Sequence, residues 1–350
     1  MFARNCQRST RPSFRSVLPG LLAATIGLTL AACGSAGDAL APSSTDQQLA
    51  PADATLASGD APLATTSESA GPDLTALSTT QRIAFTSTRK GGYDIYKMDP
   101  QGYNVTALTS AATWEFSPAW SWDNQHIALL RSRVNASNVS HYDVWVINAD
   151  GTNGHWARST ASKYDVGTPT WSPDGTQLAV AYSISGVWYV GWMNLVNGQI
   201  GIYSSLAGGL KGRYPSYTRS GKIVYMGGTG MTIDQINADG SNHKVLVAST
   251  NVGVAEPVVS PDGTKVAFDK LVGFNMDIYV KNLVDGTTKR LTTYSGFDTQ
   301  PSWSPDGTKI AFTSQRSGQW QIWTMDAATG GTVTRITHTS TVERDAAWSH

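Results

Sequence analysis

One four-residue motif recurs along the chain at intervals of 42 to 51 residues, and this spacing restricts the fold more than any other feature. Five copies begin at Pro118, Pro169, Pro215, Pro257 and Pro301, and a sixth begins at Ala346. Three copies run into an identical Ser-Pro-Asp-Gly sequence at 172–175, 260–263 and 304–307. This sequence is typical of type I turns, because proline presets φ and glycine accepts the exit geometry. A repeat of about 45 residues is typical of one four-stranded blade of a β-propeller.

A short apolar strand is expected after each turn, and the number of these strands decides the number of blades. Five begin at residues 127, 178, 223, 266 and 310, and one at residue 83 has no motif before it. The sixth motif strand, 346–349, comes after the last blade. We therefore predict an all-β, six-bladed propeller over residues 80–350, in which 346–349 pair with 83–87 and complete the blade begun by 83–109. Such closure removes exposed sheet edges.

The first 32 residues have the pattern of a secretory signal. Four arginines and no acid lie in residues 1–15, and a charge-free stretch from 16 to 37 follows, with an apolar centre at 18–30. It contains Leu30-Ala31-Ala32-Cys33, which resembles the lipobox of bacterial lipoproteins. The resemblance implies cleavage of a lipoprotein signal peptide, residues 1–32, before a diacylglyceryl-modified Cys33. Because Gly34 follows the cysteine, the same resemblance implies sorting to the outer membrane where the source has one.

Residues 33–79 consist mainly of alanine, serine, threonine, proline and aspartate, and they show no sustained apolar pattern. We predict a disordered tether between the lipidated Cys33 and the propeller. The tether contains six acidic residues and no basic one: Asp38, Asp46, Asp53, Asp60, Glu68 and Asp73. Removal of residues 1–32 leaves 22 basic and 26 acidic residues, with Cys33 as the single cysteine. No internal disulfide is therefore expected, and the lack of a basic excess argues against a nucleic-acid partner.

The blade sequences resemble those of a known repeat family. Residues 301–307 read Pro-Ser-Trp-Ser-Pro-Asp-Gly, residues 310–314 read Ile-Ala-Phe-Thr-Ser, and residues 277–279 read Asp-Ile-Tyr. These motifs are similar to the repeats of the TolB-type, WD40-like (PD40) β-propeller family, and the resemblance extends over residues 81–350. Residues 186–206 depart from it because they lack Asp-Ile-Tyr. TolB proteins carry an N-terminal α/β domain, where this chain has a lipobox and a tether.

The sequence contains no recognisable catalytic motif. The six histidines are dispersed, and there is no Gly-x-Ser-x-Gly elbow and no phosphate-binding loop. The loops 148–153 and 237–242 faintly resemble calcium loops, but they lack the distant glutamate and are expected to be hairpin turns. We predict a protein that is not an enzyme and has no metal or cofactor. A propeller enzyme acting on polysaccharide, as a lyase or hydrolase, and a purely architectural spacer are the alternatives.

Charged residues occur just before each motif, where the chain is expected to reach the axis of the propeller. They are Glu115, Asp165, Arg213, Glu256, Asp298, Glu343, Arg344 and Asp345, and Trp114, Tyr164, Tyr214 and Phe297 lie beside them. Loops on a rigid scaffold are common binding positions. We predict a mostly acidic channel mouth that binds a basic peptide or a cationic group, with solvated loop charges as the alternative. The sequence thus indicates a monomeric, lipid-anchored protein that faces the periplasm or beyond and binds an envelope protein or peptide.

Overall fold

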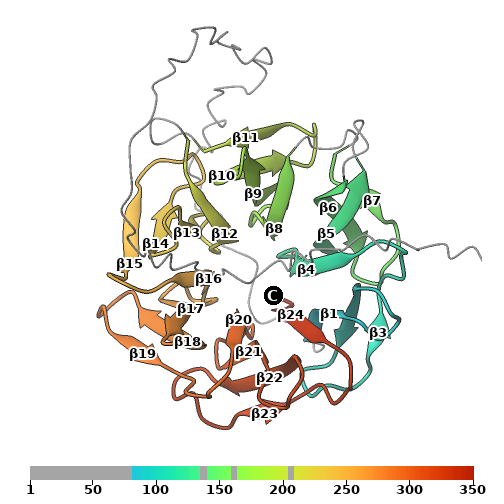
Figure 1. The fold of residues 1–350 in the computed structure, drawn as a ribbon. Coiled ribbons are helices and arrows are strands. Elements are labelled where there is room, and N and C mark those ends of the chain that lie inside the picture. The colour runs from blue at the N-terminus through green and yellow to red at the C-terminus, as the bar shows by residue number, and fades with distance from the viewer. Residues whose placement is uncertain (1–80, 135–139, 159–163, 204–208) are drawn as a thin grey trace, which may run out of the picture. The chain divides into compact units, whose positions relative to one another are not determined.

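The computed structural model describes residues 81–134, 140–158, 164–203 and 209–350. Over these residues the chain forms 24 strands and no helix, so this part contains no apolar helix of membrane-spanning length. The strands make six four-stranded antiparallel sheets around a common axis (Figure 1). The all-β class and the six blades are confirmed. The expected signal peptide at 1–32, Cys33 and the tether at 33–79 lie outside the described residues and stay predictions.

The blades are numbered in the order of their second strands, and the four strands of each blade run from the axis outwards (Figure 1). From blade 1 to blade 6 the innermost strands are β24 (Glu343–Trp348), β4 (Glu115–Trp120), β8 (Asp165–Trp171), β12 (Gly212–Tyr217), β16 (Val254–Val259) and β20 (Asp298–Trp303). The second strands are β1 (Ile83–Ser87), β5 (His126–Val134), β9 (Gln177–Ile184), β13 (Ile223–Gly227), β17 (Lys265–Val272) and β21 (Lys309–Ser314). The third strands are β2 (Asp94–Met98), β6 (Ser140–Asn148), β10 (Val187–Asn194), β14 (Thr232–Ile236), β18 (Asn275–Asn282) and β22 (Gln321–Asp326). The outermost strands are β3 (Thr106–Ala107), β7 (His155–Trp156), β11 (Ile200–Ile202), β15 (Lys244–Ala248), β19 (Thr288–Arg290) and β23 (Thr334–Arg335).

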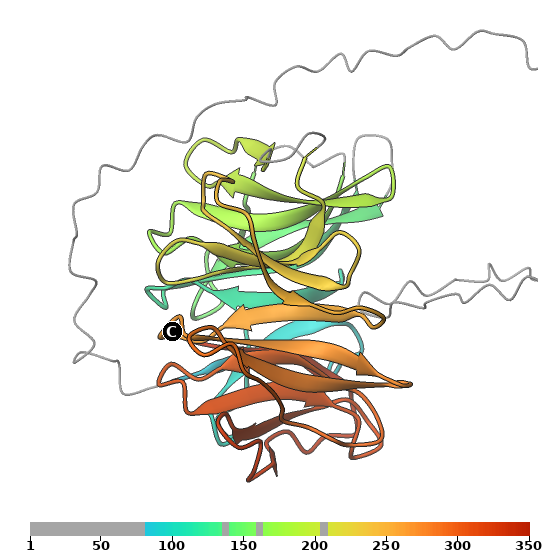
Figure 2. The same cartoon turned by 90° about the vertical axis from the view of Figure 1, so that its left-hand side faces the viewer.

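The propeller has two faces, and the strands run from one to the other (Figure 2). All innermost strands begin at the same face, which we call the start face. It also carries the connections between second and third strands, because the beginning of each innermost strand pairs with the end of the second strand, as in Val254↔Lys270. The opposite face carries the Ser-Pro-Asp-Gly turns, and we call it the turn face.

The Ser-Pro-Asp-Gly segments form the expected turns. In blade 5 the Ser260 hydroxyl and the Thr264 N–H donate hydrogen bonds to the Asp262 carboxylate, at 2.5 and 3.0 Å, and Gly263 adopts a φ of +72°. Partial burial opposes ionisation, but these hydrogen bonds lower the pKa of Asp262 to about 2. The loops that resembled calcium loops are also turns, since Asp150 accepts hydrogen bonds from the Thr152 N–H and hydroxyl.

The first blade is closed by the C-terminal strand, as the strand count predicts. Strand β24 pairs antiparallel with β1, with Ile83 opposite Trp348 and Ala84 opposite Ala347. The pairing continues past the strands, because the Ser349 N–H donates to the Arg82 carbonyl at 2.8 Å. Trp348 is buried among Ile83, Phe85 and Ile322, which belong to blades 1 and 6. The closure and the burial of Trp348 between blades are confirmed.

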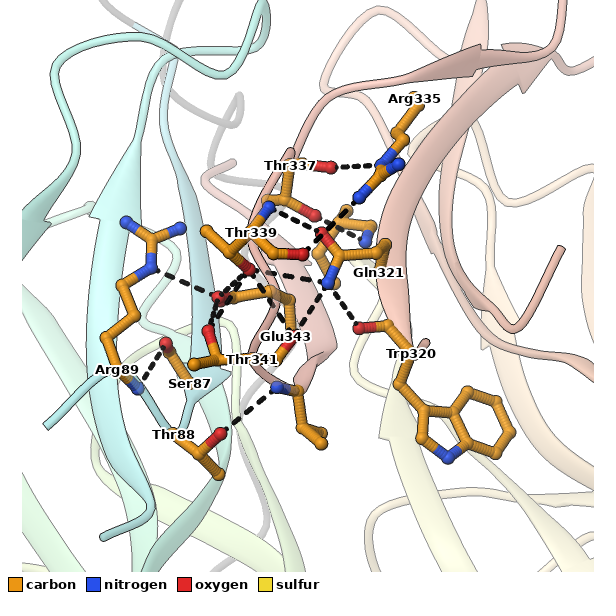
Figure 3. Close-up of polar contacts among 12 residues, drawn as sticks. Ser87, Thr88, Arg89, Trp320, Gln321, Arg335, Thr337, Thr339, Thr341 and Glu343 are labelled. Atoms are coloured by element: carbon orange, nitrogen blue, oxygen red, sulfur yellow. Dashed lines mark hydrogen bonds and ion pairs between the residues drawn. The ribbon is translucent and has the colours of Figure 1, made fainter. Parts of the chain in front are cut away.

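A polar network fixes the segment that carries the chain from blade 6 back to blade 1 (Figure 3). The Glu343 carboxylate accepts hydrogen bonds from Arg89 Nε at 3.1 Å and from the hydroxyls of Thr339 and Thr341 at 2.7 and 2.9 Å. Gln321 Nε2 donates to the Thr341 carbonyl at 2.7 Å. One buried carboxylate therefore holds together segments from both ends of the described chain.

Aromatic residues at the ends of the innermost strands join neighbouring blades. The indole N–H groups of Trp120, Trp171 and Trp303 each donate to a backbone carbonyl of the preceding blade's innermost strand, at 3.0 to 3.1 Å. Their rings are buried between adjacent sheets. The repeated tryptophan of the motif is thus a core residue that sets the contact from one blade to the next.

Candidate binding site

The innermost strands carry a backbone irregularity that determines where the predicted site residues point. Each strand has a register shift against its second strand, and in five blades the residue three positions before the terminal aromatic or valine has a positive φ: Ser117, Tyr214, Glu256, Gln300 and Asp345. Such a bulge turns a side chain out of the regular alternation of the strand. The eight predicted mouth residues therefore occupy four different environments.

Three of the predicted acids are fully buried and paired with arginine. Glu115 pairs with Arg131, Asp298 pairs with Arg316 at 2.7 Å, and Glu343 pairs with Arg89 at 3.1 Å. Burial raises the pKa of Glu115, although Thr109 and Arg131 oppose that shift. The guanidinium groups remain partly exposed while the carboxylates are covered. At these three positions the surface therefore presents cations, contrary to the acidic mouth expected from the sequence.

Two acids in the first half of the third strands, Asp143 and Asp277, have a similar structural role. Asp277 accepts hydrogen bonds from Arg290 Nη2 at 2.7 Å and from the Thr292 hydroxyl at 3.2 Å. Asp143 lies 3.5 Å from Arg133, and both Asp143 and Asp277 are completely buried. These acids are used inside the blades to hold the ends of strands.

The bulge residues of blades 5, 6 and 1 form a polar cluster beside the axis. The carboxyl groups of Glu256 and Asp269 are within hydrogen-bonding reach of each other. The Gln300 N–H donates to the Asp269 carboxylate at 3.2 Å, and its side-chain amide donates to Asp345. The Thr86 hydroxyl donates to the other Asp345 oxygen at 2.9 Å. We call Glu256, Asp269, Gln300, Asp345 and Arg344 the axial cluster.

Burial favours the protonated form of the two carboxyl groups at the centre of the axial cluster. Burial and the neighbouring carboxyl group hold the pKa of Asp269 well above its ordinary value, and burial raises the pKa of Glu256. Arg344 lies 3.3 Å from Asp345 and favours the ionised form of Glu256. Burial, followed by the charge of Glu256, raises the pKa of Tyr214 in blade 4 to about 12. Side chains from four blades therefore act on one another electrostatically.

Sequence reasoning found Glu256, Arg344 and Asp345 but missed Asp269 and Gln300. Asp269 is the fourth residue of the apolar stretch in its second strand, where the other blades have Thr86, Leu130, Ala181, Met226 and Thr313. An acid at a position where the other blades have hydroxyl or apolar residues is the sequence signal that could have identified Asp269. The position next to the bulge is apparent only when the strand pairing is known.

The remaining predicted residues lie at the start face. Asp165 is exposed and accepts a hydrogen bond from the Tyr142 N–H at 3.3 Å. Arg213 is half-buried, with its guanidinium carbon 4.2 Å from the ring centroid of Trp188 and 5.7 Å from that of Tyr214. Among the expected aromatic residues, Trp114 is 51% exposed and contacts Tyr93 and Phe116 at centroid distances of 5.8 and 6.4 Å. Phe297 packs against Trp320 at 6.2 Å.

Histidine, cysteine, aspartate and glutamate are the side chains that could hold a metal ion. Over 81–350, outside the three short gaps, no three histidine, cysteine, aspartate or glutamate side chains are grouped as a metal ion would require. In the axial cluster both carboxylate oxygens of Asp269 and of Asp345 accept hydrogen bonds, whereas Glu256 Oε2 is buried without a donor among the described residues. The chemistry of these residues is that of polar recognition and structural pairing.

Fold and site together define a six-bladed β-propeller with a polar axial cluster and an aromatic, arginine-bearing start face. The family model of the TolB beta propeller domain (PD40) matches residues 215–350. The resemblance drawn from the repeats is confirmed over that part of the chain. The Tol-Pal system protein TolB of Desulfosudis oleivorans is 31% identical over 106 residues, which make up 30% of this chain and 22% of that protein.

Solved structures share the fold at lower sequence identity. TolB from Acinetobacter baumannii superposes with a TM-score of 0.64 at 20% identity, covering 77% of this chain and 66% of that chain. A TolB-type protein from Agrobacterium tumefaciens gives a TM-score of 0.57 at 17% identity, covering 75% of this chain and 90% of that chain. At these identities the similarity concerns the fold. The matched segment spans about a fifth of the length of the curated relative from Desulfosudis oleivorans.

Proposed function

We propose that the protein is a lipid-anchored, non-catalytic binding protein of a bacterial envelope. In this proposal Cys33 carries the lipid, residues 33–79 are the tether, and the start face of the propeller binds a protein or peptide partner. The similarity of residues 215–350 to a propeller domain named after TolB supports an envelope role. The name of the curated relative, a Tol-Pal system protein, also supports a partner in the envelope.

The observation that carries the binding role is the exposure of large aromatic side chains on the start face. Phe274 stands at the tip of the β17–β18 hairpin and is 96% exposed, and Trp114 immediately precedes β4. Aromatic side chains and arginine are the residue types that contribute most to protein interfaces. Partly exposed guanidinium groups, such as those of Arg131 and Arg316, lie on the same face. This surface is suited to a partner with both apolar and polar groups.

Metabolic labelling with an alkyne analogue of palmitate tests the anchor. The protein is expected to take up the label and to lose it in Cys33→Ser. The chain provides a matched control, because Cys6 is the other cysteine and lies within the expected signal peptide. Cys6→Ser should keep the label. Labelling of Cys33→Ser, or loss of label in both variants, would contradict the lipid anchor at Cys33.

Photo-crosslinking in intact cells tests the binding face. A photoreactive phenylalanine analogue is placed at Trp114 or Phe274 on the start face, and at Tyr103 or Val284 on the turn face, where these side chains are 71% and 80% exposed. Discrete crosslinked species are expected from the start face and not from the turn face. The reverse pattern would overturn the assignment of the face. No crosslink from any position would favour the architectural spacer.

A further inference from the structure

Arginines on the start face are normally paired with an acid. Six of them have a carboxylate within 4 Å: Arg89, Arg131, Arg133, Arg290, Arg316 and Arg344. The acids come mainly from one row of residues at the start-face end of each blade. In each blade the row consists of two residues. One lies five positions before the end of the innermost strand, and the other is the residue of the third strand that lies level with it across the sheet. We call these residues the start row.

Blades 3 and 4 lack the acids of the start row. Blade 1 has Glu343 and Asp94 in the start row, and blade 2 has Glu115 and Asp143. Blade 5 has Asp277 alone, and blade 6 has Asp298 alone. In blade 3 the equivalent residues are Val166 and Tyr189, which both lie level with Tyr182. In blade 4 they are Gly212 and Thr232. The strand pairing is the same as in the other blades, but uncharged residues replace the acids that pair with arginine there.

Two cations lie in this sector, where the start row has no acid. Arg213 follows Gly212, and within the described residues its guanidinium has no carboxylate within 4 Å and no hydrogen-bond acceptor. Lys211 precedes Gly212, is exposed, and has no ion-pair partner in the same part of the chain. The short segments 135–139, 159–163 and 204–208 contain no aspartate or glutamate. The exposed Asp165 lies towards blade 2, where it accepts the Tyr142 N–H.

The indole of Trp188 holds Arg213 in position. One edge of this indole packs against Gly167, where a β-carbon would come within 3.2 Å of Cζ3. The guanidinium lies over the ring at 4.2 Å. Stacking fixes the plane of a guanidinium but leaves its edge N–H donors free for an acceptor in the same plane. Less side-chain freedom then remains to be lost when a ligand binds.

We propose that Arg213, Lys211 and Trp188 form a carboxylate-binding subsite that recognises an acidic segment of the protein partner. This inference rests on the proposed binding function and names the chemistry of the partner. A guanidinium edge matches a carboxylate with two parallel hydrogen bonds, and Lys211 adds a second positive charge. A membrane surface or a nucleic acid would require a broad field of unpaired cations. Here six arginines of the face are already paired with carboxylates, which leaves few cations for such a surface.

Fluorescence anisotropy with labelled hexaglutamate tests the subsite in the purified protein. Arg213→Gln is expected to weaken binding about tenfold, the effect of losing a charge-assisted hydrogen-bonded pair. Lys211→Gln should weaken it less. Arg219→Gln is the matched control, because Arg219 is an exposed arginine on the turn face of the same blade, and it should leave binding unchanged. Circular dichroism melting verifies that the variants are folded.

The other outcomes identify what would be wrong. Equal weakening by Arg213→Gln and Arg219→Gln, or none by either, would overturn the subsite. Binding to phosphatidylglycerol vesicles that depends on Arg213, without binding of hexaglutamate, would assign the sector to a lipid surface instead. Tighter hexaglutamate binding after deletion of residues 34–70 would assign it to the chain's own acidic segment. If start-face crosslinks persist while hexaglutamate binding fails, the proposed function stands and this inference is rejected.

Discussion

Blade 2 and blade 4 use the same strand pairing to present different chemistry at the start face. In blade 2 the start row contains Glu115, which lies level with Arg131 and is completely buried beneath it. In blade 4 the same row contains Gly212 opposite Gly227, and Arg213 beside them has no carboxylate within 4 Å among the described residues. The comparison shows that the same backbone strand pairing can carry different arrangements of charged side chains. The arginine of blade 2 is neutralised within its own blade, whereas Arg213 keeps the free donors that the proposed subsite requires.

The largest expected effect concerns blade 1, in which the start row depends on the C-terminal strand. Deletion of residues 345–350 removes Trp348, and truncation of a buried aromatic alone costs about 3–5 kcal/mol. The melting temperature should fall markedly, and proteases should cut near residue 90. Calorimetry and limited proteolysis measure both effects. Deletion of residues 34–70 serves as the control and should not change melting. Similar melting of the two truncations would contradict a stabilising role for the closure.

A direct comparison of blades 2 and 4 should give the next largest effect. Glu115→Ala leaves the largely covered Arg131 without its carboxylate, and breaking such a pair costs about 3–5 kcal/mol. Arg213→Ala removes only stacking on Trp188 and should cost about 1 kcal/mol or less. Urea denaturation measures both variants. Equal losses would mean that Arg213 has a structural role like that of Arg131.

The axial cluster should make stability depend on pH. The folded-state pKa of Asp269 is raised by burial and by Glu256, so the unfolded chain releases its proton at lower pH than the folded chain. The free energy of unfolding therefore falls as pH rises above the ordinary carboxyl range towards the raised pKa. In Asp269→Asn this fall should be absent. The substitution should therefore change the melting temperature more favourably at pH 8 than at pH 4, by about 2–4 °C. If the melting temperatures of both proteins changed in parallel between pH 4 and 8, the raised pKa of Asp269 would be contradicted.

The smallest effect is expected at the turn face, where blade 4 also differs. Blade 5 has Asp262 in its turn, whereas blade 4 has Ser220 at the equivalent position, 3.0 Å from the Thr218 hydroxyl. Asp262→Ser should cost about 0.5–1.5 kcal/mol at pH 7, the net contribution of a hydrogen bond. Because the folded-state pKa of Asp262 is about 2, this stability should be lost as pH falls from about 4 to 2. Chemical denaturation at pH 7 and pH 2 measures the difference, and an unchanged difference at pH 2 would contradict it.

The fold was accessible from the sequence because its determinants are local and repeated. Each Ser-Pro-Asp-Gly turn and each buried tryptophan can be recognised within its own blade, and the six copies fix the count. The position of the C-terminal strand followed from the same count. These features depend on turn geometry and burial, which short sequence segments encode.

The candidate site was less accessible because nearness in sequence does not determine the direction of a side chain in a bulged strand. Glu343 and Asp345 are two residues apart, but Glu343 is enclosed between blades and Asp345 joins the axial cluster. Asp269 and Trp188 belong to second and third strands, so their proximity to the mouth depends on register. The irregular sequence of blade 3 can be recognised without a structure. That it removes an acid from the start row follows only from the strand pairing, in which Tyr189 lies level with Tyr182 at the position of an acid in other blades.

The positive-φ residues of the innermost strands affect which amino-acid substitutions a propeller of this kind can accept in evolution. A side chain at a bulge is outside the pairing that holds the sheet, so its replacement does not disturb the neighbouring ladder. Asn and Asp adopt positive φ more readily than β-branched residues, and glycine does so most readily, which limits the substitutions. Tyr214, Glu256, Gln300 and Asp345 already differ in size and charge on equivalent backbones. The axis is therefore a place where side chains can differ from blade to blade while the strand pairing around it remains the same.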